Sequence, residues 1–86
     1  MKIIKKAQAG SLESCDIFLK VEPCDCGIEI NIENVVKNRF VERIKKIIKE
    51  TLKELLVENV KIDINDKGAL DCTIKARLET AILRAC

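Results

Sequence analysis

The sequence predicts one small α/β (α+β) domain, a two-layer sandwich in which two helices cover one face of a three-stranded sheet. Three observations carry this prediction. Short runs alternate apolar and polar residues, which is typical of half-buried strands. Two longer runs repeat apolar residues every three or four positions, which is typical of amphipathic helices. The chain has 86 residues, enough for a single domain with a thin core. The predicted order is β-β-α-β-α, with the sheet antiparallel or mixed.

The first half of the chain contains two predicted strands. Residues 1–14 show no clear period and are rich in small side chains, so we expect a flexible N-terminal arm. Residues 17–22 alternate as a strand does, and Pro23 ends the run. A turn leads to residues 28–32, the cleanest alternation in the chain. The two runs are expected to pair as an antiparallel hairpin.

The second half contains the helices. Asn34 is a favourable N-cap, and apolar residues recur at helical spacing over residues 34–57, which predicts a long amphipathic helix. Residues 60–65 predict the third strand. The last segment is ambiguous, because its start also alternates like a strand. The helical pattern over residues 69–85 is longer, so we favour a helix there, with a strand over residues 69–75 as the alternative.

Composition limits the function. Lysine and arginine nearly balance the acidic residues, for a net charge of +2, and aromatics make up only 2% of the chain, whereas single-stranded nucleic-acid sites rely on aromatic stacking. No apolar run reaches the roughly 18–20 residues that span a bilayer, and no signal-peptide core is present. Five cysteines without a signal peptide indicate reduced thiols. We therefore expect a cytoplasmic protein without nucleic-acid or membrane partners.

The residues also argue against catalysis and metal binding by this chain. It has no histidine, so the imidazole base that activates a serine or cysteine nucleophile is absent. Cys24 and Cys26 form one C-x-C pair with neither a second pair nor a histidine, whereas structural zinc sites combine two such pairs. We expect no catalytic residue and no metal ligand.

Two segments resemble the citrate lyase acyl carrier protein (gamma chain) family. "AGSLESCDIFLKVEP", residues 9–23, resembles the family's A-G-T-L-E-S-x-D opening followed by a strand. "INDKGALDCTIKARLETAILRA", residues 64–85, resembles its D-K-G-A-L-D-C segment followed by a helix. Two separate motifs in the right order make the resemblance specific, and it covers essentially the whole chain.

The resemblance implies that Ser14 carries a phosphoribosyl-dephospho-coenzyme A prosthetic group through a phosphodiester, added by a prosthetic-group transferase. Glu13, Cys15 and Asp16 flank this site. The thiol of the group carries acetyl or citryl as a thioester. The alpha chain of the complex exchanges acetyl for citryl, and the beta chain cleaves citryl to oxaloacetate and regenerates the acetyl carrier, so that citrate yields acetate and oxaloacetate. Cys15 stands where the family shows a small glycine or serine.

Three other functions stay open at this point. A malonate decarboxylase acyl carrier subunit is related and uses a similar group, although the D-K-G-A-L-D-C letters favour citrate lyase. A plain protein-interaction module would use the helix surface and treat Ser14 as an ordinary turn residue. A small basic nucleic-acid binder would use the lysines and arginines of the first helix, although interleaved glutamates more often mark a solvated face.

Overall fold

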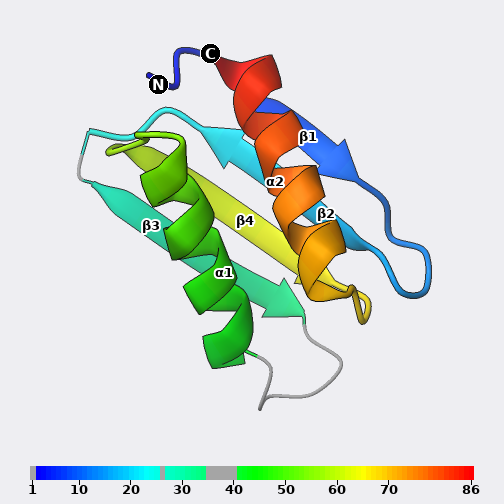
Figure 1. Ribbon diagram of the computed structural model, residues 1–86. Helices are drawn as coiled ribbons and strands as arrows, with labels where there is room; N and C mark the ends of the chain where they lie inside the picture. Colours follow the sequence, from blue (N-terminus) through cyan, green and yellow to red (C-terminus); the bar gives the residue numbers. More distant parts are fainter. Residues whose placement is uncertain (1, 26, 35–40) are drawn as a thin grey trace.

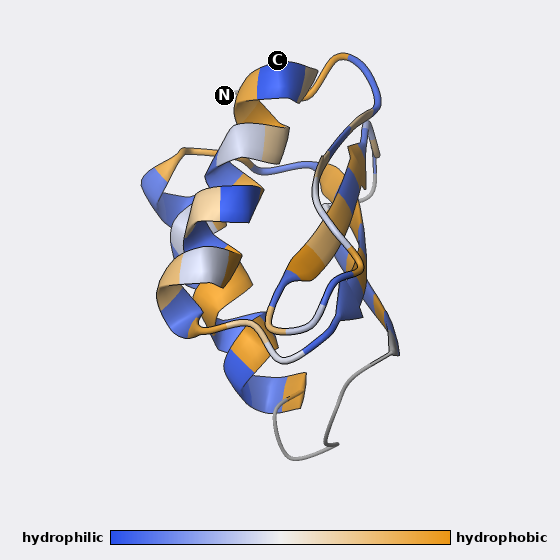
Figure 2. Cartoon of the chain, turned by 90° about the vertical axis from the view of Figure 1, so that its right-hand side faces the viewer, coloured by the Kyte–Doolittle hydropathy of each residue, from blue (hydrophilic) through white to orange (hydrophobic). Residues whose placement is uncertain are grey.

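The computed structural model of the protein describes residues 2–25, 27–34 and 41–86. Two helices lie on one face of a four-stranded sheet (Figure 1), and the side view shows the helices and the sheet as two layers (Figure 2). The elements are β1 (Ala7–Gly10), β2 (Ile17–Glu22), β3 (Ile28–Asn34), α1 (Val41–Glu54), β4 (Val60–Asp66) and α2 (Asp71–Ala85). The predicted two-layer α+β sandwich is confirmed, with one more strand than expected.

The sheet is mixed, with the strand order β1-β2-β4-β3. β4 runs antiparallel to β2, with Ile17 opposite Asp66, and parallel to β3, with Ile28 opposite Val60. The predicted hairpin between β2 and β3 is therefore wrong, because β4 lies between these two strands. A parallel pair needs a long crossover between its strands, and the segment that contains α1 supplies it.

The prediction of a flexible arm over residues 1–14 is wrong for β1. Ala9 is buried and lies opposite Leu19 in an antiparallel pair with β2. Ahead of β1, the backbone N–H groups of Ile4 and Lys5 donate to the Ala85 carbonyl at 2.9 and 3.1 Å, which satisfies an orphan acceptor at the end of α2. The strand was hard to predict because alanine and glycine side chains give a weak alternating pattern.

The core lies between the sheet and the two helices. Alternate residues of β4 are buried, Asp66 among them, and the intervening ones lie on the open face of the sheet. Ile44, Ile48 and Leu52 cover the core from α1. From α2 the buried residues are Ile74, Leu78, Ala81, Ile82 and Ala85. This continuous apolar face explains why residues 71–85 form a helix, and the alternative of a strand there is wrong.

The first predicted helix is confirmed over Val41–Glu54, but its predicted start is wrong. Asn34 pairs with Asn65 in the sheet and is the last residue of β3. Residues 35–40 of the predicted helix lie outside the described part of the chain. At the other end, Leu56 adopts φ 57° and the Val57 N–H donates to the Leu52 carbonyl at 2.9 Å, as in a Schellman C-cap. Within the described ranges, neither helix has the length and apolarity to cross a membrane.

Gly10 lies against the start of β2, and Gly27, which lies elsewhere, provides a comparison. Gly10 and Gly27 both have positive φ, 93° and 91°. A Cβ at Gly10 would collide with the carbonyl oxygen of Ile17, whereas one at Gly27 meets open space. We expect Gly27→Ala to lower the free energy of unfolding by about 0.5–1 kcal/mol, because left-handed strain of about 1–2 kcal/mol is offset by about 0.5–1 kcal/mol of lost freedom in the unfolded chain. Gly10→Ala adds an overpacking cost of about 1–3 kcal/mol. Urea unfolding measures both, and equal losses would contradict the close approach.

Candidate functional site

The polar loop between β1 and β2, residues 11–16, contains the sequence candidates Glu13, Ser14, Cys15 and Asp16. It lies beyond the tip of β1, beside the loop that joins β4 to α2 (Figure 1). The antiparallel pairing of β2 with β4 produces this placement, because it sets the start of β2 opposite the end of β4. The two regions of family resemblance, far apart in the sequence, therefore meet at one end of the sheet.

A tight turn places Ser14 at the surface. The Asp16 N–H donates to the Glu13 carbonyl at 3.2 Å, so Ser14 and Cys15 occupy the two central positions of a four-residue turn. Cys15 has φ 63°, a left-handed conformation that glycine adopts without a steric penalty. Glu13, Ser14 and Cys15 are all exposed. The backbone requirement explains why a glycine at position 15 would suit this turn.

Backbone hydrogen bonds hold the turn against the loop that follows β4. The Cys15 N–H donates to the Lys67 carbonyl at 2.8 Å, and the Lys67 N–H donates to the Asp16 carbonyl at 2.9 Å. Lys67 is itself placed by a turn in which the buried Asp66 accepts the Ala69 N–H at 3.0 Å. The β2–β4 pairing thus continues past the strands, and it fixes the backbone on one side of Ser14.

The Asp16 carboxylate is the centre of the loop's polar contacts. Its Oδ2 accepts from the Ser11 hydroxyl at 2.7 Å and from Arg77 Nη2 at 3.1 Å. Its Oδ1 accepts from the Ile17 N–H at 2.8 Å and from Arg77 Nε at 3.2 Å. The hydrogen bonds from the Ser11 hydroxyl and then from the Ile17 N–H are the main causes that lower the pKa of the Asp16 carboxyl below its ordinary value. Burial raises this pKa in part, and Arg77 lowers it further. These four contacts make Asp16 a structural anion rather than a general base.

The contacts distinguish the two serines of the loop. The Ser11 hydroxyl is already hydrogen-bonded, because it donates to Asp16 and accepts from the Glu13 N–H at 3.3 Å. Ser14 is exposed, and among the described residues none hydrogen-bonds to its hydroxyl. The loop therefore presents one hydroxyl to the outside on a fixed turn. Such an arrangement suits modification by another protein, and among the described residues none is hydrogen-bonded to Ser14 as the base that self-activation needs.

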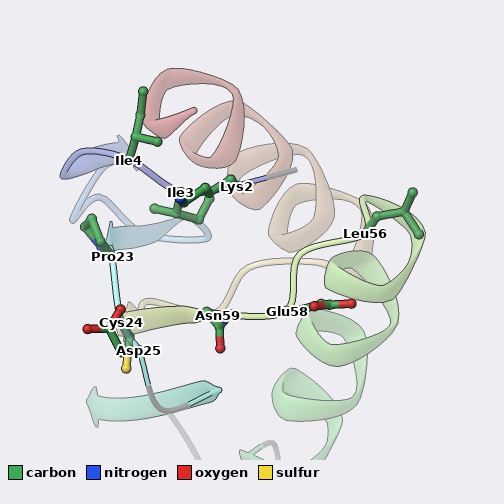
Figure 3. A pocket seen from close by; sticks show the side chains of 9 residues that line it. All are labelled: Lys2, Ile3, Ile4, Pro23, Cys24, Asp25, Leu56, Glu58 and Asn59. Atoms are coloured by element: carbon green, nitrogen blue, oxygen red, sulfur yellow. The ribbon is translucent and has the colours of Figure 1, made fainter.

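Of the Cys24 and Cys26 candidates, the structure describes Cys24, which lies away from this loop. Cys24 follows the far end of β2 and lines a surface pocket of about 520 Å³ together with Ile3, Ile4, Pro23 and Leu56 (Figure 3). Cys26 lies outside the described residues, so the C-x-C pair is not tested as a metal ligand. Residues 2–25, 27–34 and 41–86 contain no cluster of three side chains suited to hold a metal ion.

Two contributors to the loop were not predicted from the sequence. Arg77 reaches Asp16 from α2 across 61 positions, and Ser11 supplies a hydrogen bond where only Ser14 was given a role. Neither has a local signature, since a serine in a turn is common and an arginine on an amphipathic helix is most often solvated. Only the packing of α2 against β1 and β2 brings them together.

Comparisons with known proteins agree with this fold. A family model described as "ACP: Malonate decarboxylase delta subunit (MdcD)" matches residues 4–85. The citrate lyase acyl carrier protein of Clostridium perfringens is 54% identical over 86 residues, covering 99% of this chain and 85% of that protein. Those of Lacticaseibacillus casei and Escherichia fergusonii are 47% and 45% identical, again over 99% of this chain and over 84% and 89% of their own lengths.

A solved structure shares the fold. It is a crystal structure of a Pseudomonas malonate decarboxylase hetero-tetramer in complex with malonate, and one of its chains matches with a TM-score of 0.77. The match covers 95% of this chain and 84% of that chain at 22% sequence identity. At this identity the likeness concerns the arrangement of helices and strands.

The left-handed turn residue predicts the effect of replacing Cys15. Glycine at this position removes left-handed strain of about 1–2 kcal/mol, offset by about 0.5–1 kcal/mol of extra freedom in the unfolded chain. We expect Cys15→Gly to raise the free energy of unfolding by about 0.5–1 kcal/mol. Cys15→Ala is the matched control, because it removes the thiol and keeps the Cβ. A glycine variant less stable than the alanine variant would contradict the turn geometry.

The lowered pKa of Asp16 predicts an acid-sensitive contribution to stability. Since the folded-state pKa lies below the ordinary value of 3.8, the stabilisation is present above about pH 4 and is lost as the pH falls through the folded-state pKa. We expect Asp16→Asn to cost about 1–2 kcal/mol at neutral pH, and the gap from wild type to shrink in urea titrations below pH 4. Glu13→Gln, which removes an exposed carboxylate from the same turn, serves as the control. A gap that stays constant down to pH 2 would contradict the charged contacts of Asp16.

Proposed function

This chain belongs to the citrate lyase acyl carrier protein family, and from that membership we propose that it is the acyl carrier subunit of a citrate lyase complex, with Ser14 as the attachment residue. The observation that carries the choice of residue is the contrast between Ser14 and Ser11. Ser14 is exposed, and its hydroxyl has no hydrogen-bond partner among the described residues, whereas the Ser11 hydroxyl donates a hydrogen bond to Asp16. The predicted site thus coincides with the hydroxyl that the loop leaves available.

The residues of the turn fit a phosphoribosyl-dephospho-coenzyme A group attached through a phosphodiester. A group of this size needs a hydroxyl that projects from the surface with no wall around it, and Glu13, Ser14 and Cys15 are exposed together. The Asp16 charge is paired with Arg77, which limits the repulsion that a carboxylate would exert on a phosphodiester. When attached, the group supplies a terminal thiol on which an acyl group is carried as a thioester.

The chain's own residues then have a mechanical role. The turn, the Lys67 backbone contacts and the Asp16 contacts hold the backbone around Ser14 in place. The long group provides the reach by which one carrier serves more than one active site, because tethering raises the local concentration of the carried acyl group. We infer a non-catalytic carrier, whose alpha chain (acyl transferase) and beta chain (citryl lyase) partners supply acyl exchange and cleavage.

A second candidate is the acyl carrier subunit of malonate decarboxylase. The description of the matching family model favours it. The relatives at 45–54% identity that are named for citrate lyase favour the first candidate. Loading the modified chain with citryl or malonyl in the presence of each complex separates the two, since only the correct partners turn over its thioester.

The attachment residue is tested by intact mass after co-expression with the prosthetic-group transferase of a citrate lyase system. We expect the wild-type chain to gain the mass of one group, and tandem mass spectrometry to place it on Ser14. Ser14→Ala loses the gain completely, because it removes the only atom through which the ester forms. Thr80→Ala, which removes a hydroxyl elsewhere on the surface, keeps it.

Two results would overturn the assignment. One is a wild-type chain that gains no mass in the presence of an active transferase. The other is a mass gain that persists in Ser14→Ala. Circular dichroism of each variant establishes that the fold is intact before either result is interpreted.

A further inference from the structure

Arg77 joins α2 to the loop that carries Ser14. Its Nε and Nη2 donate to the two oxygens of Asp16 at 3.2 and 3.1 Å, a bidentate pair. The Arg77 side chain is 45% exposed and that of Asp16 is 15% exposed, so the contact is partly shielded from water and is less weakened by solvent than a fully exposed pair. A guanidinium has five N–H donors, and this contact uses two of them.

The position of this pair matters for the charge near Ser14. Glu13 and Asp16 lie one residue before and two residues after the serine, in the same turn. A group attached through a phosphodiester brings further negative charge, and like charges close together repel. Arg77 pairs with Asp16 and so removes one of the two local sources of repulsion. It also holds the last residue of the turn through its side chain, in addition to the Lys67 backbone contacts.

We propose that Arg77 is a positioning residue for the modification of Ser14, acting through Asp16 to hold the turn and to neutralise its charge. This inference rests on the proposed function. In the step concerned, the Ser14 Oγ forms a bond to the phosphorus of a donor activated as a phosphoanhydride. The bond from that phosphorus to the leaving phosphate chain breaks, and the hydroxyl proton passes to a base of the transferase. Arg77 makes no bond in this step.

The variants separate charge from geometry. Arg77→Lys keeps a cation but loses the planar bidentate fork. Arg77→Gln removes both the positive charge and the bidentate fork, and so leaves the Asp16 carboxylate without the Arg77 cation. Arg77→Gln combined with Asp16→Asn removes the two charges together. The matched control is Arg84→Gln on the same helix, which loses the contact from Arg84 Nη1 to the Gln8 carbonyl at 2.9 Å and leaves the Ser14 loop untouched.

Two measurements are made on each chain. The first is the initial rate of mass gain at Ser14 with limiting transferase and saturating donor. The second is hydrogen exchange of the Cys15 amide, which is bonded to the Lys67 carbonyl and reports on the turn without any modification. We expect Arg77→Gln, which loses both hydrogen bonds to Asp16, to slow mass gain about tenfold, a factor that corresponds to about 1.4 kcal/mol for a partly exposed pair. We also expect it to speed Cys15 exchange. Arg77→Lys and the double variant fall between it and wild type, and Arg84→Gln matches wild type.

The outcomes distinguish this inference from the function on which it rests. Wild-type chain without mass gain at Ser14 overturns both. Mass gain at Ser14 that is within twofold in wild type and Arg77→Gln overturns the role of Arg77 alone. So does an equal slowing in Arg84→Gln, since it would show a general effect of weakening α2. A selective slowing in Arg77→Gln, with partial recovery in the double variant, supports the role of its charge.

Discussion

The hydrogen bonding of β4 on both of its edges is the interaction on which the rest of the molecule depends. Its parallel pairing with β3 makes the intervening α1 lie across the sheet, and its antiparallel pairing with β2 sets the end of one strand against the start of the other. Through the second pairing, Lys67 meets Cys15 and Asp16. The candidate site is therefore a product of tertiary pairing, although four of its residues are consecutive in the chain.

Both helices cover the same face of this sheet. Both helices contribute apolar residues to one core, and two exposed ion pairs join them, Arg43–Asp71 at 2.6 Å and Glu54–Lys75 at 3.1 Å. Exposed pairs of this kind contribute little to stability, about 0–1 kcal/mol each, so the apolar faces hold α2 in place. That placement has a second effect, because it is what brings Arg77 to the Ser14 loop. Core packing and the chemistry of the site are thus linked through one helix.

Much of this arrangement could be predicted from the sequence, and the failures have physical causes. The strands beginning at Ile17, Ile28 and Val60 were predicted from their alternation, and α2 from its long apolar face. β1 was missed because Ala7 and Ala9 bury little area. The hairpin prediction failed because periodicity identifies strands but does not say which strands are neighbours. Ser14 was found by the resemblance of its motif, whereas the roles of Ser11 and Arg77 depend on contacts that no local pattern encodes.

The short turn at Glu13–Asp16 has a further consequence for how a carrier of this design would operate. Its backbone is hydrogen-bonded to the Lys67 loop and within the turn, and the Asp16 side chain is bonded to Arg77 of α2, so the turn would act as a fixed base and not as a hinge. The travel of a group attached there would be the sum of its own length and the few torsions of a serine side chain. Moving the Ser14 backbone toward another active site would then require moving the entire domain. A complex built on such a carrier would select among its active sites by how it seats this domain, and the loop itself would not have to bend.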